Sequence, residues 1–178
     1  MNEVIIRTNF NTKVGLGHLY RTKILANKFK EQNYKVTFAL DNQNNKEKNL
    51  LNFEYFSLYS KNSKFVSQIK DAEILKEKIR KRQVKYIIID DYRIDLKWEK
   101  FFYKKGKKVI VFDDLQNRKH LCDFIIDSRW VDLESFTSRY KDLIPKNCKR
   151  LLGPKYSIIN PSLSKTEKRS KSLNLLLY

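Results

Sequence analysis

The sequence predicts an α/β domain whose core is a parallel, doubly wound sheet. Short runs of β-branched and other apolar residues indicate strands buried on both faces, and amphipathic segments with apolar residues three and four apart separate these runs. Strands that alternate with helices in this way form a parallel sheet covered by helices. With 178 residues, of which 41% are apolar, the chain can form one hydrophobic core.

The first half of the chain predicts three strands and two helices. A central strand is expected at residues 4–6, a helix at 18–32, a second strand at 36–40 and a weaker third strand at 55–58. Residues 65–79 then repeat apolar side chains at helical spacing and predict the second helix. Residues 41–49, between the second and third strands, are polar and are expected to form an exposed loop.

The second half continues the alternation. Residues 86–89 predict a buried strand, residues 96–103 a shorter helix, and residues 109–112 and 124–126 two further strands. In a parallel sheet of this kind the functional loops gather at the carboxyl ends of the strands. We therefore expect the functional residues at that rim.

The end of the chain predicts a change in organisation. Residues 1–160 are expected to form the domain, and the Ser- and Lys-rich residues 161–172 a linker. Residues 173–178 resemble the first strand of a carboxy-terminal domain, which they are too short to form alone. Either the protein is truncated or another chain supplies the rest.

The charge balance raises the question of a polyanionic partner. Lys and Arg number 38 against 20 Asp and Glu, which gives a formal net charge of +18. Because the basic residues are scattered through every segment, we interpret them as a solvated surface and expect no specific nucleic-acid partner.

Other features narrow the class of protein. No apolar stretch is long enough to span a membrane and no secretion signal is present, so we expect a cytoplasmic protein without a membrane partner. Cys122 and Cys148 cannot form a disulfide framework, and His120 and Cys122 lack enough nearby ligands for a zinc site. We expect no metal and no cofactor.

A glycine loop between the first strand and the first helix is the strongest candidate site. Gly15 and Gly17 allow a sharp turn and a close approach of the backbone to a ligand. The free N–H groups and the positive end of the helix dipole suit a diphosphate, with Arg21 one turn further on. The same helix terminus disfavours an imidazolium, so we expect a neutral His18 that can act as a general base. The alternative is a capping or packing histidine.

Two acidic pairs follow two of the predicted strands. Asp90 and Asp91 close one strand, and Asp113 and Asp114 close the next, so both pairs should project from the same rim. Clustered carboxylates there could orient a sugar or bind a metal. The alternative is that each aspartate caps the turn that follows it.

A longer series of segments runs in order through nearly the whole chain. The series comprises Arg7 to Asn9, Gly15 to His18 with Arg21, residues 88–92, residues 112–114, His120 to Asp123, Tyr140, residues 143–145, Cys148 and residues 152–156. In this order it resembles the hydrolases of pseudaminic acid biosynthesis that act on UDP-2,4-diacetamido-2,4,6-trideoxy-β-L-altropyranose. The resemblance implies a glycosyltransferase-B-like protein whose Rossmann-like amino-terminal domain carries the base, while a second domain grips UDP.

The resemblance also implies site residues. His18 would deprotonate the water that attacks the anomeric carbon, with inversion and departure of UDP, and Tyr92 matches an active-site tyrosine of the family. The substrate-binding residues would be Asn9, Gly15, Gly17, Arg21, Asp91, Tyr92 and Asp114.

The chain departs from the family pattern at three places. Asn9 replaces an Asp, Asn160 replaces an Arg, and residues 127–129 replace an Asn-rich segment. Two other functions therefore stay open. One is a glycosyltransferase or a sugar-nucleotide-binding protein of the same architecture. The other is a non-catalytic remnant whose basic surface binds polyanions.

Overall fold

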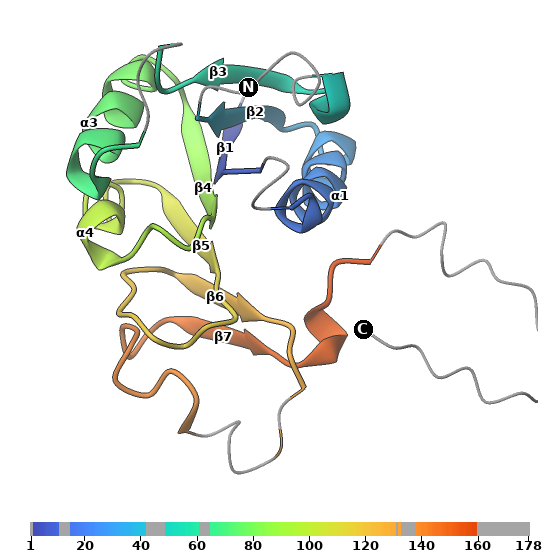
Figure 1. Ribbon diagram of the computed structural model, residues 1–178, viewed down its shortest axis with the longest axis vertical. Helices are drawn as coiled ribbons and strands as arrows, with labels where there is room; N and C mark the ends of the chain where they lie inside the picture. The colour runs from blue at the N-terminus through green and yellow to red at the C-terminus, as the bar shows by residue number, and fades with distance from the viewer. Residues whose placement is uncertain are drawn as a thin grey trace, which may run out of the picture.

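The computed structural model describes residues 2–10, 15–41, 49–60, 65–130, 132 and 138–159. Within these ranges, seven parallel strands form one sheet in the order β3-β2-β1-β4-β5-β6-β7 (Figure 1). The strands are β1 (Glu3–Thr8), β2 (Lys35–Leu40), β3 (Glu54–Ser57), β4 (Val84–Asp90), β5 (Lys108–Phe112), β6 (Phe124–Asp127) and β7 (Lys149–Leu152). The predicted α/β fold with a parallel, Rossmann-like sheet is confirmed.

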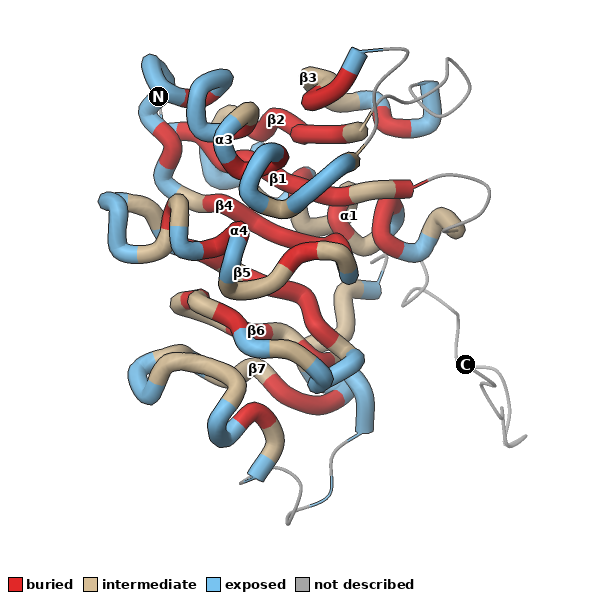
Figure 2. Tube along the Cα trace, turned by 60° about the vertical axis from the view of Figure 1, so that its left-hand side comes forward, coloured by how far each residue is buried: buried red, intermediate tan, exposed pale blue. Residues whose placement is uncertain are grey.

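Helices cover both faces of the sheet. Helix α1 (Gly17–Glu31) lies on one face, while α3 (Gln68–Lys78) and α4 (Leu96–Glu99) lie on the other (Figure 1). Because successive side chains of a strand point to opposite faces, β1 sends Val4 and Ile6 into the core beneath α1 and Ile5 into the core beneath α3. The central strands are consequently buried on both faces, as Figure 2 shows.

Several elements differ from the sequence prediction. Helix α4 covers only four of the eight residues predicted as helix, and the chain then runs through turns to Gly106, whose φ is +72°. Strand β7 and the short 3-10 helix η1 (Pro154–Tyr156) were not predicted. With only four residues, two of them basic, β7 carries too little apolar pattern to be recognised.

The strand order places the candidate site at a switch point. Strand β1 pairs with β2 on one side and with β4 on the other. The connection after β1 leads to β2, and the connection after β4 leads to β5 in the opposite direction along the sheet. Ligands of doubly wound sheets bind in the crevice opened at such a point. The two acidic pairs follow β4 and β5, which are neighbours in the sheet, so the prediction that they share one rim is confirmed.

A buried ionic network joins the sheet to α3. The fully buried Arg7 donates to both oxygens of Asp71, at 3.1 and 2.8 Å, and to Asp41 at 2.6 Å. Asp71 also accepts from the hydroxyl of Tyr59 and the indole N–H of Trp98, each at 2.7 Å. The charge inside the core is therefore paired and hydrogen-bonded, which the cost of burying it requires.

No described helix is long and apolar enough to span a membrane. The predicted linker and carboxy-terminal strand, residues 161–178, and Asn160 lie outside the described residues, as do residues 42–48 of the predicted loop.

Candidate functional site

The first turn of α1 carries the predicted base. The helix begins at Gly17, and Leu16 at its N-cap has no side chain that could accept from the first N–H groups. His18, the second residue of the helix, is largely buried, with 10% of its side-chain surface exposed. Within the described ranges no side chain caps these N–H groups, and together with the helix dipole they favour an anion at this end.

His18 contacts the carboxylate at the end of β4. Its Nδ1 lies 2.5 Å from Oδ1 of Asp90, which is completely buried. Arg21, one turn along α1, donates from Nε to Oδ2 of Asp90 at 2.6 Å and from Nη2 to Oδ1. Both oxygens of Asp90 are thus occupied, and its backbone carbonyl accepts from Thr8 Oγ1 at 3.1 Å. His18 and Arg21 hold the carboxylate, and Thr8 holds the backbone that carries it.

These contacts determine which ring nitrogen of His18 carries the proton. Nδ1 faces the acceptor Asp90 at 2.5 Å and the donor Arg21 at 3.3 Å. The shorter contact favours a proton on Nδ1, because Asp90 can accept it and Arg21 cannot. In the neutral ring Nε2 then keeps its lone pair. A neutral imidazole held in this tautomer can take a proton from water.

Asp90 also keeps Arg21 protonated. Burial alone would lower the pKa of Arg21, but hydrogen bonding and Coulomb attraction from Asp90 raise it above its ordinary value. The guanidinium also lies 5.2 Å from the centre of the Phe112 ring and, through Nη1, 3.7 Å from Asp114. Arg21 therefore stays a cation beside His18.

Tyr92 packs against the imidazole. The rings of Tyr92 and His18 meet edge to face, with centres 4.8 Å apart and planes at 76°. Burial and the nearby carboxylate of Asp114 raise the pKa of Tyr92 to about 12, so the phenol stays protonated at neutral pH. Arg118 lies over the same ring, 5.7 Å from its centre. The structure thus brings Arg21, Tyr92 and Asp114 together around His18.

The glycine loop has the backbone form that the sequence predicts. Gly15 has a φ of +92°, which side chains disfavour, and a Cβ at Gly15 or Gly17 would meet no protein atom within 4 Å. The space beside both glycines is therefore free of described protein atoms. Asn9 follows β1 and is half-buried, and no hydrogen bond joins it to His18 among the described residues.

Asp91 lies in a different cluster from His18. Its carboxylate accepts from the backbone N–H of Arg93 at 3.0 Å and pairs with the Arg93 side chain at 2.5 Å, with Arg7 3.7 Å away. Burial alone would raise the pKa of Asp91, but Arg93 and Arg7 hold it below its ordinary value. The alternative that an aspartate caps the following turn describes Asp91 best.

In the second acidic pair, Asp113 has a structural role that differs from that of Asp114. Asp113 accepts from the backbone N–H groups of Leu115 and Gln116 and pairs with Arg118 at 3.0 Å, so it caps the turn that carries Asp114. His120 lies 3.7 Å from Asp113, too far for a direct hydrogen bond, while its Nδ1 is 2.6 Å from Glu99. Although burial opposes it, the two carboxylates raise the pKa of His120 to about 9.

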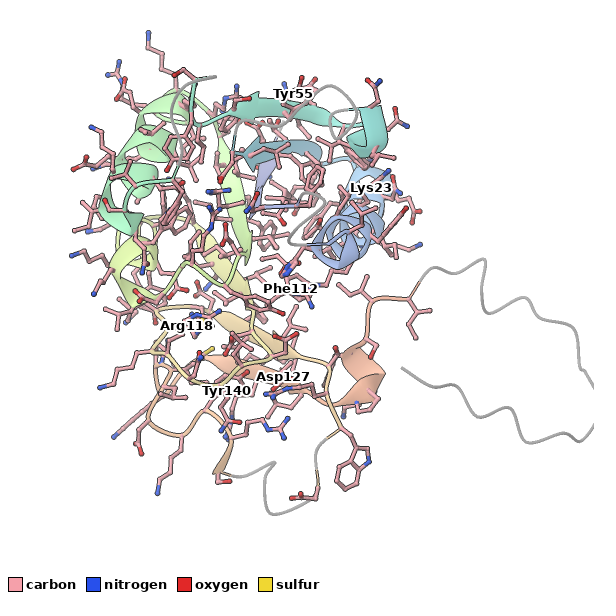
Figure 3. All side chains as sticks on the ribbon, in the orientation of Figure 1. Lys23, Tyr55, Phe112, Arg118, Asp127 and Tyr140 are labelled. Atoms are coloured by element: carbon pink, nitrogen blue, oxygen red, sulfur yellow. The ribbon has the colours of Figure 1, made fainter. Side chains whose placement is uncertain are left out.

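Further along the rim, Asp127 is buried between two arginines. It pairs with Arg129 at 2.7 Å and Arg139 at 3.3 Å, and it accepts from the hydroxyl of Tyr140, which lies beside it in Figure 3. Residues 127–129 therefore contact the segment that follows β6 and have a structural role.

The sequence analysis missed the role of Asp90. It named the residue only as one member of an acidic pair, and the residue it chose for the substrate was Asp91. The available signal was positional: Asp90 ends the strand that neighbours β1, and it alone of the pair continues the strand. Among the described residues no group of three or more His, Cys, Asp and Glu side chains could hold a metal ion.

Comparisons with known proteins find a match over nearly the whole chain. No family model matches the chain. The chain is 24% identical over 170 residues to the UDP-2,4-diacetamido-2,4,6-trideoxy-β-L-altropyranose hydrolase of Campylobacter jejuni. The match covers 95% of this chain but 56% of that relative. Nearly the whole chain is thus similar to little more than half of a protein named as a UDP-sugar hydrolase.

Proposed function

We propose that this chain carries the catalytic base of a hydrolase that releases UDP from a UDP-linked diacetamido-trideoxy sugar. The observation that carries the proposal is the contact between His18 and Asp90 at the amino terminus of α1. The similarity to a UDP-sugar hydrolase supports the choice of substrate.

In this proposal His18 acts on a water molecule. Asp90 accepts the Nδ1 proton, and Nε2 takes a proton from water as the water oxygen bonds to the anomeric carbon. The bond between that carbon and the UDP oxygen breaks at the same time, and its electron pair leaves with UDP. Attack from the face opposite UDP inverts the anomeric centre. The imidazolium then returns its proton to solvent.

A single base suffices for this step because the leaving group is a stable anion. UDP departs without taking a proton, so the site has to stabilise negative charge rather than supply an acid. The uncapped amino terminus of α1 and the cation Arg21 are the groups here that favour such charge.

In this proposal, UDP is bound by a part of the protein that lies beyond the described residues. The chain spans 56% of the length of its relative. We propose that residues 1–160 act as the sugar-binding domain, that residues 161–172 link it to the first strand of a second domain at 173–178, and that this second domain, or a separate chain, holds UDP. The proposed site of action is the cytoplasm, where UDP-sugars are made and used.

The decisive experiment follows the oxygen atom. The chain, together with the second domain that holds UDP in this proposal, is incubated with the UDP-diacetamido-trideoxy sugar in water enriched in ¹⁸O, and the products are analysed by mass spectrometry. We expect one ¹⁸O in the free sugar and none in UDP. Label in UDP would mean attack at phosphorus, and a new glycoside formed on an added sugar acceptor would mean a transferase. Either outcome would contradict the proposal.

A further inference from the structure

Two free cysteines lie in contact at the amino ends of the last two strands. Cys122 comes shortly before β6 and Cys148 directly before β7, and their Sγ atoms are 3.5 Å apart. They are the two cysteines of the sequence. One pair is too few for a disulfide framework that holds a fold together, but it is enough for one reversible bond.

The backbone holds the two cysteines side by side. Lys149, which follows Cys148, donates its N–H at 2.9 Å to the carbonyl of Asp123, which follows Cys122. The N–H of Cys148 itself donates at 2.9 Å to the carbonyl of Pro145 and closes the turn before β7. A disulfide bond is about 2.0 Å long, so the two sulfur atoms have to approach by about 1.5 Å to form one. The fold thus places the sulfur atoms in contact and leaves a small further approach.

The two thiols differ in their access to solvent. Cys122 is fully buried in the core beneath α3, whereas Cys148 is partly exposed at the edge of that core. An oxidant in solution therefore needs to reach only Cys148. Cys122 is the group that reacts next, because its sulfur already touches that of Cys148.

The two thiols also differ in acidity. The hydrogen bond from Cys122 holds the pKa of Cys148 below its ordinary value. The nearby His120 acts in the same direction, while burial and the carboxylates of Asp123 and Glu99 act against it. The same hydrogen bond and burial raise the pKa of Cys122. Cys148 is therefore the thiol that ionises first, and the thiolate is the form that attacks a peroxide.

We propose that Cys148 and Cys122 form an oxidation site at which a hydroperoxide converts the two thiols into a disulfide. The Cys148 thiolate bonds to one oxygen of the peroxide, the O–O bond breaks, and the leaving oxygen takes up the proton that the thiol released. The Cys122 sulfur then bonds to the sulfur of the Cys148 sulfenic acid, whose oxygen leaves as water with the proton of the Cys122 thiol. In sum, the two thiols lose two electrons and two protons, and the hydroperoxide is reduced to an alcohol and water.

The disulfide joins the start of β6 to the start of the edge strand β7. The two cysteines are 26 residues apart, and a cross-link over such a loop stabilises a fold mainly by restricting the unfolded chain. The pair lies at the amino ends of the strands, whereas Asp90 ends β4 at the carboxyl rim. This inference does not depend on the proposed function, because its readouts are the mass and the melting temperature of the chain.

The test oxidises the full chain with hydrogen peroxide. We expect the intact mass to fall by the mass of two hydrogen atoms, and tryptic digestion without reductant to yield the peptide 120–129 joined to the peptide 147–149. The melting temperature should rise by roughly 5–10 °C, the shift that a loop of this size predicts. Dithiothreitol should reverse both changes by thiol–disulfide exchange.

Two single variants test the order of events. Cys122→Ser leaves Cys148 without its partner thiol, so the sulfenic acid should persist on Cys148 and be labelled by dimedone. Cys148→Ser keeps only the buried thiol, which should stay unmodified under the same conditions. Neither variant should show the rise in melting temperature.

Three results would overturn the proposal. The first is two unmodified thiols in the wild type under conditions that fully oxidise glutathione added to the sample. The second is a disulfide between two chains in place of the link between peptides 120–129 and 147–149 of one chain. The third is dimedone labelling of Cys122 in folded Cys148→Ser, which would show that the buried thiol is the one that the peroxide reaches.

Discussion

The Nδ1 atom of His18 lies 2.5 Å from Oδ1 of Asp90, although 72 residues separate them in the chain. The contact forms because β4, which ends at Asp90, is the sheet neighbour of β1, and α1 begins shortly after β1. It fixes both the orientation of the imidazole and the nitrogen that carries the proton. Asp90 is therefore a positioning residue for the proposed base.

Replacing Asp90 by Asn tests this role. The amide can turn its N–H toward Nδ1 and stabilise the wrong tautomer of His18, with the proton on Nε2. We expect UDP release to fall by up to about 10,000-fold, the loss seen when the carboxylate partner of a catalytic histidine becomes an amide. Nitrogen-15 NMR of the His18 ring should show the change of tautomer. Asp95→Asn, at the N-cap of α4, should leave the rate and the tautomer unchanged.

Tyr92 supports the imidazole mainly through its ring. Tyr92→Phe keeps the edge contact with His18 and removes only the hydroxyl, so we expect UDP release to fall by less than about tenfold. Tyr92→Ala removes the contact and should cost considerably more. Steady-state kinetics of the two variants checks the order. An equal loss in the two variants would show that the hydroxyl, not the ring, matters.

The network around Asp71 predicts a large effect on stability. Asp71→Leu leaves Arg7, Tyr59 and Trp98 without their shared acceptor inside the core, so we expect the free energy of unfolding to fall by about 3–5 kcal/mol. Urea denaturation measures the loss. Asp142→Leu, an exposed change, should alter stability by less than about 0.5 kcal/mol. Equal stability of the two variants would refute the role of the network.

The pKa of His120 predicts how stability depends on pH. Folding raises this pKa from 6.5 to about 9, because Asp113 and Glu99 outweigh the effect of burial. The protonated ring is therefore favoured in the folded state, and its stabilisation is complete below about pH 6.5 and is lost as pH rises through about 9.

His120→Gln isolates this effect. The unfolding free energy of the wild type should exceed that of the variant by on the order of 3 kcal/mol more at pH 6 than at pH 10. Guanidinium denaturation at a series of pH values gives both curves. A difference that does not change with pH would mean that His120 is neutral throughout.

Most of the fold could be predicted from the sequence because its strands are continuous apolar runs. Residues 86–89 and 109–112 are of this kind, and both became central strands. Prediction failed where the chain is held by tertiary contacts. Strand β7 exists because it extends the edge of a sheet already formed by β6, and α4 ends at Glu99, whose carboxylate accepts from Leu121 and contacts His120.

The candidate site, too, could be predicted only in part. Gly15, Gly17 and His18 could be recognised because a glycine loop and a helix start lie in one short segment. The choice between Asp90 and Asp91 could not be made, since it depends on which side chain faces α1 and which faces α3. One step along the strand reverses that direction, so Asp90 meets Arg21 and Asp91 meets Arg93.

The proposal that His18 is the base is tested most directly by the rate of UDP release in His18→Asn. Asn keeps an N–H that can face Asp90 but has no nitrogen that can take a proton from water. The substrate is the UDP-diacetamido-trideoxy sugar, and an unchanged unfolding free energy serves as the control. We expect the variant to release UDP at least about 100-fold more slowly than the wild type. Release at the wild-type rate would contradict the account.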